Sequence, residues 1–502
     1  SSTNPGGHMD ELWYHLYVAI SRCNRAIMAV KANGDATLGK ELAKVRLGEA
    51  RFLRGHFYFK LAQVFNKVPY IDEDILASAA QEQTSNNLSH EELMMKIVAD
   101  FDSAYKVLPA KQNEIARVNK YAAAAMLAKC YLNMAYGDGY EDNTGYSHIN
   151  DKYMKKVDEY TKIIADCPDY DYEDDFGDIF MQNNKNGKES IFAVQHSNYE
   201  DDNTKLGRSN WSNMLNGCHG MWSKGWDFHK PSQNLVNAFK VNEEGLPMFD
   251  DYEKVHNIYP ISGVEQDQKW DPRLFHTVGL PTFPYKYQTG PSDDKDKDGN
   301  PLVKSLLMTK DNARCPSSYG FYTSLKEVPQ RKSGESYTES TWQGFAMNDY
   351  VVRYTEVMLW RAEALIELDQ IPEAIGIIND IRRRANRSVA KYISYAANKI
   401  RTLGTYDEGT TNKADARKYL QWEKRLEMAM ESERFFDLRR WGLASKTMNE
   451  YFAAEQNSNY EGMDYAGYLA SAHFQAGKNE YWPIPYQQLF YVPGLYTQNA
   501  GY

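Results

Sequence analysis

Helical periodicity near both ends of the chain predicts a mostly α-helical fold with a loop-rich middle. In residues 11–165 and 357–442, apolar side chains recur at spacings of three and four, the period of an amphipathic helix. Between about Cys167 and Met347 that period disappears, and Gly, Pro, Asn, Asp and aromatic residues accumulate. A long non-periodic block is typical of a functional or disordered region, and its many aromatic residues argue against disorder.

The first third of the chain is predicted to be a series of helices separated by prolines. Ser89, followed by Glu92 three residues later, matches a capping box at the start of one helix. Pro69, Pro109 and Pro168 stand just after predicted helix ends, where proline is tolerated. The predicted helices are Glu11–Ala32, Lys40–Phe65, Ser89–Leu108, Val118–Tyr136 and Lys152–Ala165.

The middle and the last third add a short strand and a helix pair. The run SIFAVQ at Ser190–Gln195 predicts a short buried strand. Val357–Ala385 predicts two helices joined by a short turn, with small alanines on the first helix that allow its partner to approach closely. This pattern and a similar one at 121–137 resemble tetratricopeptide helix pairs, of which we expect about four in an irregular array.

The stretch Trp422–Gly442 combines ten charged side chains with an apolar face, and it is predicted to be one helix that ends at Gly442. Paired carboxylates on a helix suit catalysis or metal binding, but a di-metal helix would carry Glu-x-x-His and this stretch has no histidine. The alternative is a structural ion-pair network beside a packed face. We therefore expect internal pairing of the residues Glu427, Glu431, Arg434 and Asp437.

Composition narrows the class of protein. A net charge of −10 argues against a nucleic-acid partner, which would need a basic surface. The 37 Tyr, 20 Phe and 10 Trp residues predict extended aromatic contact surface. Five scattered cysteines have no metal-binding spacing, and their odd number argues against a full disulfide framework. No apolar run is long enough to span a membrane, and no signal peptide is visible, so the chain is either cytoplasmic or begins downstream of its targeting segment.

Six motifs follow one another along nearly the whole chain. They are EARFLRGHFYFKLAQVFNKVPY at 49–70, WDPRL at 270–274, RYTEVMLWRAEA with IINDIRRRAN at 353–386, EKRLEMAMESERFFDLRRWG at 423–442, WPIP at 482–485 and QNAGY at 498–502. In this order they resemble the SusD/RagB family, nutrient-binding outer-membrane lipoproteins of Bacteroidetes. Their joint occurrence is far more specific than any one of them.

The resemblance implies a SusD-like α-helical fold in one compact domain with three regions. These are an N-terminal helical region at 1–175, a loop-rich ligand-binding region at 176–346, and a C-terminal helical region with a loop-rich tail at 347–502. It also implies a lipid-anchored protein on the outer face of the outer membrane. There it would bind oligosaccharide or polysaccharide, without catalysis or a cofactor, for import through a SusC-like TonB-dependent transporter.

The family's lipidated cysteine is not recognisable in this chain. The sequence opens almost on the first predicted helix, and Cys23 lies inside that helix. We therefore expect the lipid-bearing portion, and with it part of the ligand site of some relatives, to precede the residues present here.

Sugars bind by stacking their C–H faces on aromatic rings and by hydrogen bonds between their hydroxyls and planar polar groups. The middle region offers both in loops, where binding residues are commonly found. The candidate ligand-binding residues are Arg208, Asn210, Trp211, Trp222, Trp226, Tyr285, Tyr287, Tyr319 and Trp342. The alternative for each ring is packing inside a loop-rich subdomain. By contrast, Trp360, Trp422 and Trp441 lie in helical patterns and are predicted to be core residues.

An acidic loop is a weak calcium candidate. Asp294, Asp296 and Asp298 alternate before Gly299, as in the first half of a calcium-binding loop. Ser305 stands where such a loop would carry its bidentate glutamate, so a solvated surface loop is the alternative.

Two other functions stay open. A glycoside hydrolase would need two facing carboxylates, and 68 acidic residues leave room for such a pair. The chain lacks the Gly-x-Ser-x-Gly, His-Glu-x-x-His and Walker motifs of other enzymes. A scaffold whose helix pairs bind a peptide or protein is the second alternative.

Overall fold

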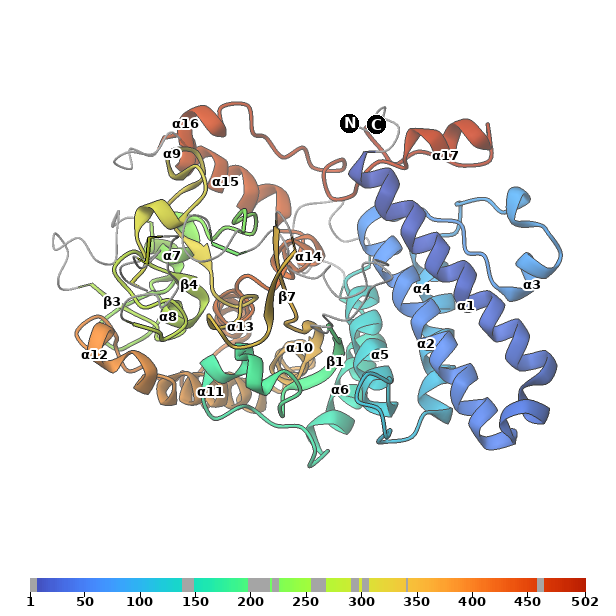
Figure 1. Cartoon of the computed structure of the whole chain (residues 1–502), viewed down its shortest axis with the longest axis horizontal. Coiled ribbons are helices and arrows are strands. Elements are labelled where there is room, and N and C mark those ends of the chain that lie inside the picture. Colours follow the sequence, from blue (N-terminus) through green and yellow to red (C-terminus); the bar gives the residue numbers. More distant parts are fainter. Residues whose placement is uncertain are drawn as a thin grey trace. The chain divides into compact units, whose positions relative to one another are not determined.

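A computed structural model describes residues 7–137, 149–196, 217–218, 225–253, 268–289, 298–299, 307–339, 342–457 and 465–502. This part of the chain is mostly α-helical with a few short strands, as predicted (Figure 1). Internal contacts divide the chain into two compact units. Unit 1 contains residues 1–167, 435–449 and 473–502, and unit 2 contains residues 168–434 and 450–472.

Unit 1 is built from long helices that pack in sequence order, coloured blue to cyan in Figure 1. The neighbours in contact are α1 with α2, α2 with α4, α4 with α5, and α5 with α6. Each of the five predicted helices is confirmed, and the first extends beyond its predicted end. The helices are α1 (His8–Leu38), α2 (Lys40–Phe65), α3 (Glu73–Ala77), α4 (His90–Val107), α5 (Lys120–Ala135), α6 (Asp151–Ala165) and α17 (Tyr486–Tyr491).

Polar contacts fix the ends and the interior of these helices. The predicted capping box at α4 is confirmed: the Ser89 hydroxyl accepts from the Glu92 backbone N–H at 3.2 Å, and the Glu92 carboxylate accepts from the Ser89 backbone N–H at 2.8 Å. In the interior, the buried Arg54 of α2 pairs with Asp100 of α4 at 2.6 Å and with Glu73 of α3. This charge cluster joins three helices.

The C-terminal tail packs on the end of α2. The Trp482 backbone N–H donates to the carbonyl oxygen of Val64 at 2.9 Å. The Asn499 amide donates to the carbonyl oxygens of Phe65 at 2.8 Å and Trp482 at 2.7 Å. The WPIP and QNAGY motifs therefore contact the end of the first motif of the chain.

Unit 2 combines a helical layer with short strands. Helices α10, α11 and α13 pack against one another, and α14 (Arg434–Arg440) and α15 (Ala444–Gln456) each have residues in both units. The remaining helices are α7 (Gln233–Ala238), α8 (Leu274–Thr277), α9 (Pro316–Tyr319), α10 (Tyr354–Glu367), α11 (Ile371–Arg387), α12 (Ile393–Ala396), α13 (Lys413–Glu427) and α16 (Tyr465–Tyr468).

The described strands pair as antiparallel two-stranded sheets. They are β1 (Ser190–Val194) with β8 (Asp349–Arg353), β2 (Lys240–Val241) with β3 (Lys269–Trp270), β4 (Val278–Gly279) with β5 (Thr323–Ser324), and β6 (Ser336–Glu339) with β7 (Trp342–Phe345). Strand β1 confirms the predicted strand at residues 190–195, and its register places Ser190 opposite Arg353.

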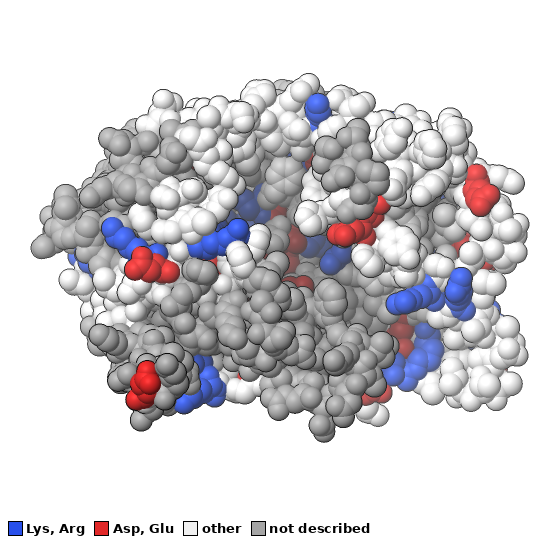
Figure 2. Space-filling model, turned by 45° about the horizontal axis from the view of Figure 1, so that its top comes forward, with Lys and Arg blue, Asp and Glu red and all other residues white. Residues whose placement is uncertain are grey.

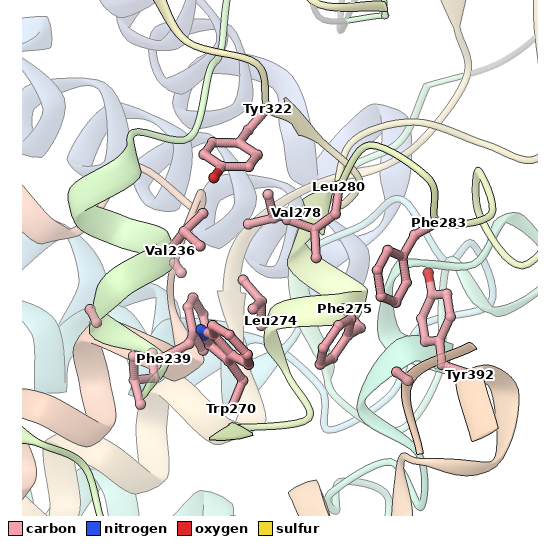
Figure 3. Packing of buried hydrophobic residues seen from close by; sticks show 14 residues of the cluster. Val236, Phe239, Trp270, Leu274, Phe275, Val278, Leu280, Phe283, Tyr322 and Tyr392 are labelled. Carbon is pink, nitrogen blue, oxygen red and sulfur yellow. The ribbon is translucent and has the colours of Figure 1, made fainter. Parts of the chain in front are cut away.

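The loop-rich part of unit 2 is ordered around a hydrophobic core. Figure 3 shows side chains of α7, β3, α8 and β4 converging, with the Trp270 ring beside Phe239. Leu426 and Ala429, from α13 and the turn after it, belong to the same cluster. The predicted core positions of Trp360 and Trp441 are confirmed by complete burial, while Trp422 is partly buried against this core.

The prediction of one helix over Trp422–Gly442 is wrong. Helix α13 ends at Glu427 and α14 begins at Arg434. Between them Met430 and Ser432 have φ angles of 63° and 65°, in the left-handed region that an α-helix cannot contain. Gly442, with a φ of 68°, ends the second helix as predicted.

The expected pairing within that helix is also wrong for Glu427 and Glu431. The Glu431 carboxylate accepts from the Lys326 ammonium at 2.6 Å and from Arg353 Nε at 2.7 Å. Glu427 lies 3.0 Å from guanidinium nitrogens of both Arg353 and Arg273. The partners therefore come from segments distant in sequence, whereas Asp437 does pair with a neighbour in its own helix.

These contacts form one buried network with balanced charge. Its five cations are Arg273, Lys326, Arg353, Arg382 and Arg384, and its five carboxylates are Glu189, Asp271, Glu423, Glu427 and Glu431. Burial alone would raise the pKa of Glu427, but three guanidinium groups outweigh it and hold that pKa well below its usual value. Glu423, Glu427 and Glu431 of the motif at 423–442 are thus structural, which confirms the ion-pair alternative for these residues.

Two further features of the described residues concern the cysteines and the helices. All five cysteines are free, and Cys23 is buried within α1, as expected. Among the helices that the structure describes, none combines the length and apolar character needed to cross a bilayer.

Candidate functional site

A cleft of about 370 Å³ lies in unit 2, between segments that are far apart in the sequence. They are residues 227–232 before α7, Arg314 before α9 with Tyr319 at its end, Tyr451 of α15, and residues 468–469 at the end of α16. Helices α9 and α16 contact each other, and α15 lies beside them at the upper left of Figure 1. The lining residues are Asp227, Phe228, Lys230, Pro231, Ser232, Arg314, Tyr319, Tyr451, Tyr468 and Leu469.

Aromatic rings form much of the wall of this cleft. Phe228 and Tyr468 keep 55% and 59% of their surface exposed, so each offers a ring face to a ligand. Tyr319 supports Tyr468 edge-on, with ring centroids 4.9 Å apart and an interplanar angle of 85°. Because exposed rings inside a concavity bind flat apolar faces, this wall is suited to stacking.

Asp227 holds the polar side of the cleft in place. Its buried carboxylate accepts from the Lys230 ammonium at 2.5 Å and from the Arg314 backbone N–H at 3.1 Å. Its φ of 50° is in the left-handed region, which is unusual for a residue other than glycine and is commonly found at functional sites. The backbone thereby turns sharply between two aromatic residues, Trp226 and Phe228.

Those two rings position the Arg314 side chain. The guanidinium carbon lies 5.0 Å from the ring centre of Trp226 and 4.5 Å from that of Phe228. Contacts of this kind stabilise a cation over an aromatic face. Burial lowers the pKa of the nearby Lys230 despite its contact with Asp227, and the charge of Arg314 contributes to the same shift.

Two of the predicted ligand-binding residues lie at this cleft. Tyr319 lines it, and Trp226 packs on Arg314, which lines it. The structure places Tyr285 and Tyr287 elsewhere. The Tyr285 ring is fully buried, with its hydroxyl donating to a backbone carbonyl at 3.0 Å, and Tyr287 packs against the hydrophobic core.

Several predicted residues cannot be placed. Arg208, Asn210, Trp211 and Trp222 lie outside the described residues, and of Trp342 only the backbone at the start of β7 is described. Their roles stay predictions.

The calcium candidate also stays a prediction. Asp294 and Asp296 lie outside the described residues, and Asp298 is exposed. No group of three or more His, Cys, Asp or Glu side chains in the described part of the chain is arranged to hold a metal ion.

The sequence reasoning missed Phe228, Arg314 and Tyr468. Phe228 stands two residues from the predicted Trp226, and that adjacency is a signal that could have identified it. Nothing local in the sequence marks Arg314 or Tyr468, because only the folded chain brings them to the same cleft.

Charged side chains of both signs are visible on the face shown in Figure 2. Described Lys, Arg, Asp and Glu residues gather there in small groups of mixed sign, without the broad positive surface that a nucleic acid would need.

Family models identify the chain. A model of the SusD family matches residues 188–502, which is more than half of the sequence. The chain belongs to the SusD family. A second model, described as starch-binding associating with outer membrane, matches residues 3–132. The resemblance inferred from the six motifs is thereby confirmed.

Relatives of this SusD-family chain share its full length at low identity. SusD-like protein P2 of Formosa agariphila is 23% identical over 99% of this chain and 81% of its own length. A SusD homolog from Bacteroides thetaiotaomicron has a similar structure, with a TM-score of 0.71, 20% identity, and coverage of 100% of this chain and 87% of its own. The shared fold is therefore SusD-like.

Two further solved structures have names that mention carbohydrates. A laminarin binding SusD-like protein has a TM-score of 0.62 and 19% identity, covering 98% of this chain and 85% of its own. A crystal structure with xylogluco-oligosaccharide has a TM-score of 0.64 and 16% identity, covering 98% of this chain and 88% of its own.

Proposed function

We propose that this SusD-family chain binds a carbohydrate in the cleft of unit 2. The observation that carries the proposal is the pair of exposed rings, Phe228 and Tyr468, in one cleft with the planar guanidinium of Arg314. Rings take the C–H faces of a sugar, and a planar polar group takes its hydroxyls. The carbohydrate-binding neighbours of the same fold support this ligand class.

The proposed binding is non-catalytic. Hydrolysis of a glycosidic bond needs two carboxyl groups that flank it. Asp227 is the only carboxylate among the described residues that line the cleft, and it is buried and paired with Lys230. The carboxylates of the buried ion-pair network in unit 2 each have a cationic partner.

The residues that the structure leaves undescribed are part of the proposal. Arg208, Asn210, Trp211 and Trp222 precede the cleft segment in sequence and carry the same aromatic and planar polar chemistry. We propose that they extend the binding surface, together with Trp342. Tyr285 and Tyr287 are left out of the proposed site because they pack in the interior.

We further propose that the protein acts at the outer membrane with a SusC-like TonB-dependent transporter. The family membership and the outer-membrane description of the model matching residues 3–132 support this partnership. Solubilised outer membranes from the source bacterium should yield the transporter with the tagged protein, and recovery of the protein alone would count against the partnership.

Titration with a panel of oligosaccharides and a panel of peptides tests the function class. We expect at least one oligosaccharide to bind with a Kd on the order of micromolar to millimolar, since a shallow stacking site gives modest affinity. Reducing ends should not accumulate during incubation with the cognate polysaccharide. Binding of peptides alone would support the scaffold function, and released reducing ends would support a hydrolase.

A further inference from the structure

Arg314 differs from the fully buried arginines of unit 2. Arg273, Arg353, Arg382 and Arg384 all form ion pairs with carboxylates. The Arg314 guanidinium instead contacts the rings of Trp226 and Phe228, and no ion pair or side-chain hydrogen bond holds it within the described part of the chain. Ring contacts use the faces of a guanidinium and leave the N–H groups at its edge able to donate.

Among the described residues that line the cleft, cations outnumber carboxylates. Asp227 is the single carboxylate among the described lining residues, and its contact with the Lys230 ammonium offsets one of the two cations. Among these lining residues the charge of Arg314 has no carboxylate to offset it, although the whole chain is acidic with a net charge of −10. A stacked guanidinium with a fixed orientation is preorganised to donate two parallel hydrogen bonds to an oxyanion.

We propose that the carbohydrate bound in this cleft carries an anionic group, a carboxylate or a sulfate ester, and that Arg314 binds that group. The inference rests on the proposed function, since it specifies the class of carbohydrate taken by the same site. Phe228 and Tyr468 would stack on the sugar rings while Arg314 pairs with the charged substituent. The single charge of Arg314 matches one anionic group on the sugar unit that contacts it.

Calorimetric titration of the full chain with matched pairs of oligosaccharides tests this inference. One pair is an oligogalacturonate and its carboxyl-reduced form, and the other is a sulfated galactan oligosaccharide and its desulfated form. In at least one pair we expect the anionic member to bind roughly tenfold or more tightly, as charge-assisted hydrogen bonds predict. If only the first pair shows a preference for the anionic member, the group bound by Arg314 is a carboxylate. If only the second pair shows it, the group is a sulfate ester.

Variants assign the preference to Arg314. Arg314→Gln should bring the two members of the preferred pair within about twofold of each other, and Arg314→Lys should retain part of the difference. Arg425→Gln is the matched control, because Arg425 also stacks on two rings, Tyr252 and Trp422, but does not line the cleft. The control should keep the full preference.

A measurement on the unmodified protein keeps the inference testable if Arg314→Gln fails to fold. The affinity for the preferred anionic oligosaccharide should fall as NaCl rises from 50 to 500 mM, because salt screens the ion pair. Equal binding of neutral and anionic members would overturn the inference and leave carbohydrate binding standing. Absence of binding to every neutral and anionic oligosaccharide would overturn both.

Discussion

Asp227 is the residue on which the geometry of the cleft depends. Its left-handed backbone turns the chain between Trp226 and Phe228, so that both rings contact the same guanidinium. Its carboxylate fixes Lys230 and the backbone of Arg314. A single buried acid thus positions both cations and both rings, and its left-handed backbone is the kind of local strain that is commonly found at functional sites.

Glu455, in the same helix as the cleft residue Tyr451, gives a pH prediction. Burial, with the nearby Glu253 as a second cause, raises the pKa of Glu455 to about 7. At pH values between the usual pKa of a glutamate and 7, the folded state binds this proton more tightly than the unfolded state. The free energy of unfolding therefore decreases as the pH rises through that range. Glu455→Gln should therefore raise the free energy of unfolding at pH 8 by about 1–2 kcal/mol.

Thermal unfolding of the variant at pH 8 and at pH 4.5 measures this effect. The variant should have a higher free energy of unfolding than the unmodified protein at pH 8. This gain should disappear at pH 4.5, where the carboxyl group of Glu455 is protonated in the folded unmodified protein. Glu450→Gln, at an exposed position of the same helix, is the control and should show no such dependence. A gain of equal size at both pH values would show that the raised pKa is not its cause.

At the scale of single residues, the sequence showed which segments are rich in rings but not which rings line the cleft. Trp226 and Tyr319 were predicted from their aromatic and polar neighbours, and both lie at the cleft. Tyr285 had the same local pattern and is buried. Local composition shows that rings are abundant, but whether a given ring faces solvent depends on contacts with distant segments.

At the scale of elements, the interruption between α13 and α14 shows where periodicity fails. The apolar spacing continues through residues 428–433, so the pattern predicts a helix across them. The actual conformation brings Glu431 to Lys326 and Arg353. These partners are distant in sequence, and local propensity cannot anticipate a tertiary ion pair of this kind.

The network itself predicts a large effect of one substitution. Glu427→Gln removes a negative charge from among three buried guanidinium groups, Arg273, Arg353 and Arg384, and leaves them undercompensated. We expect a loss of about 3–5 kcal/mol in the free energy of unfolding, measured by urea denaturation at pH 7. The loss should diminish in acid, because a depressed carboxyl pKa contributes stability that is lost as pH falls through it.

A surface ion pair provides the comparison for this prediction. Glu373, half exposed on α11, lies 2.6 Å from a nitrogen of Arg361. Glu373→Gln should lower the free energy of unfolding by about 1 kcal/mol or less, because exposed ion pairs contribute little to stability. Equal costs for the two substitutions would contradict the structural role of the network.

At the scale of the whole molecule, motifs that are far apart in the sequence meet in pairs. In unit 1 the WPIP and QNAGY motifs pack on the end of the first motif, through Trp482 and Asn499. In unit 2 Arg273 of WDPRL pairs with Glu427 of the motif at 423–442, at 3.0 Å. Each motif therefore supplies contacts that another requires, which explains why their joint occurrence identified the family and the helical fold correctly.

The cleft was not predictable at this scale. Its walls come from residues 227–232, 314–319, 451 and 468–469, and no periodicity or motif links them. The helices were predictable because their signals are local, whereas a cleft between loops requires the arrangement of the folded chain.

The most direct test of carbohydrate binding in this cleft compares two tyrosines of equal exposure. Tyr468 lines the cleft and is 59% exposed, whereas Tyr14 on α1 is 60% exposed and lies in unit 1. For a carbohydrate that the unmodified chain binds, Tyr468→Ala should raise the Kd roughly five- to thirtyfold, the effect of losing about 1–2 kcal/mol of stacking. Tyr14→Ala should leave the Kd unchanged; unchanged affinity in a folded Tyr468→Ala variant would contradict the account.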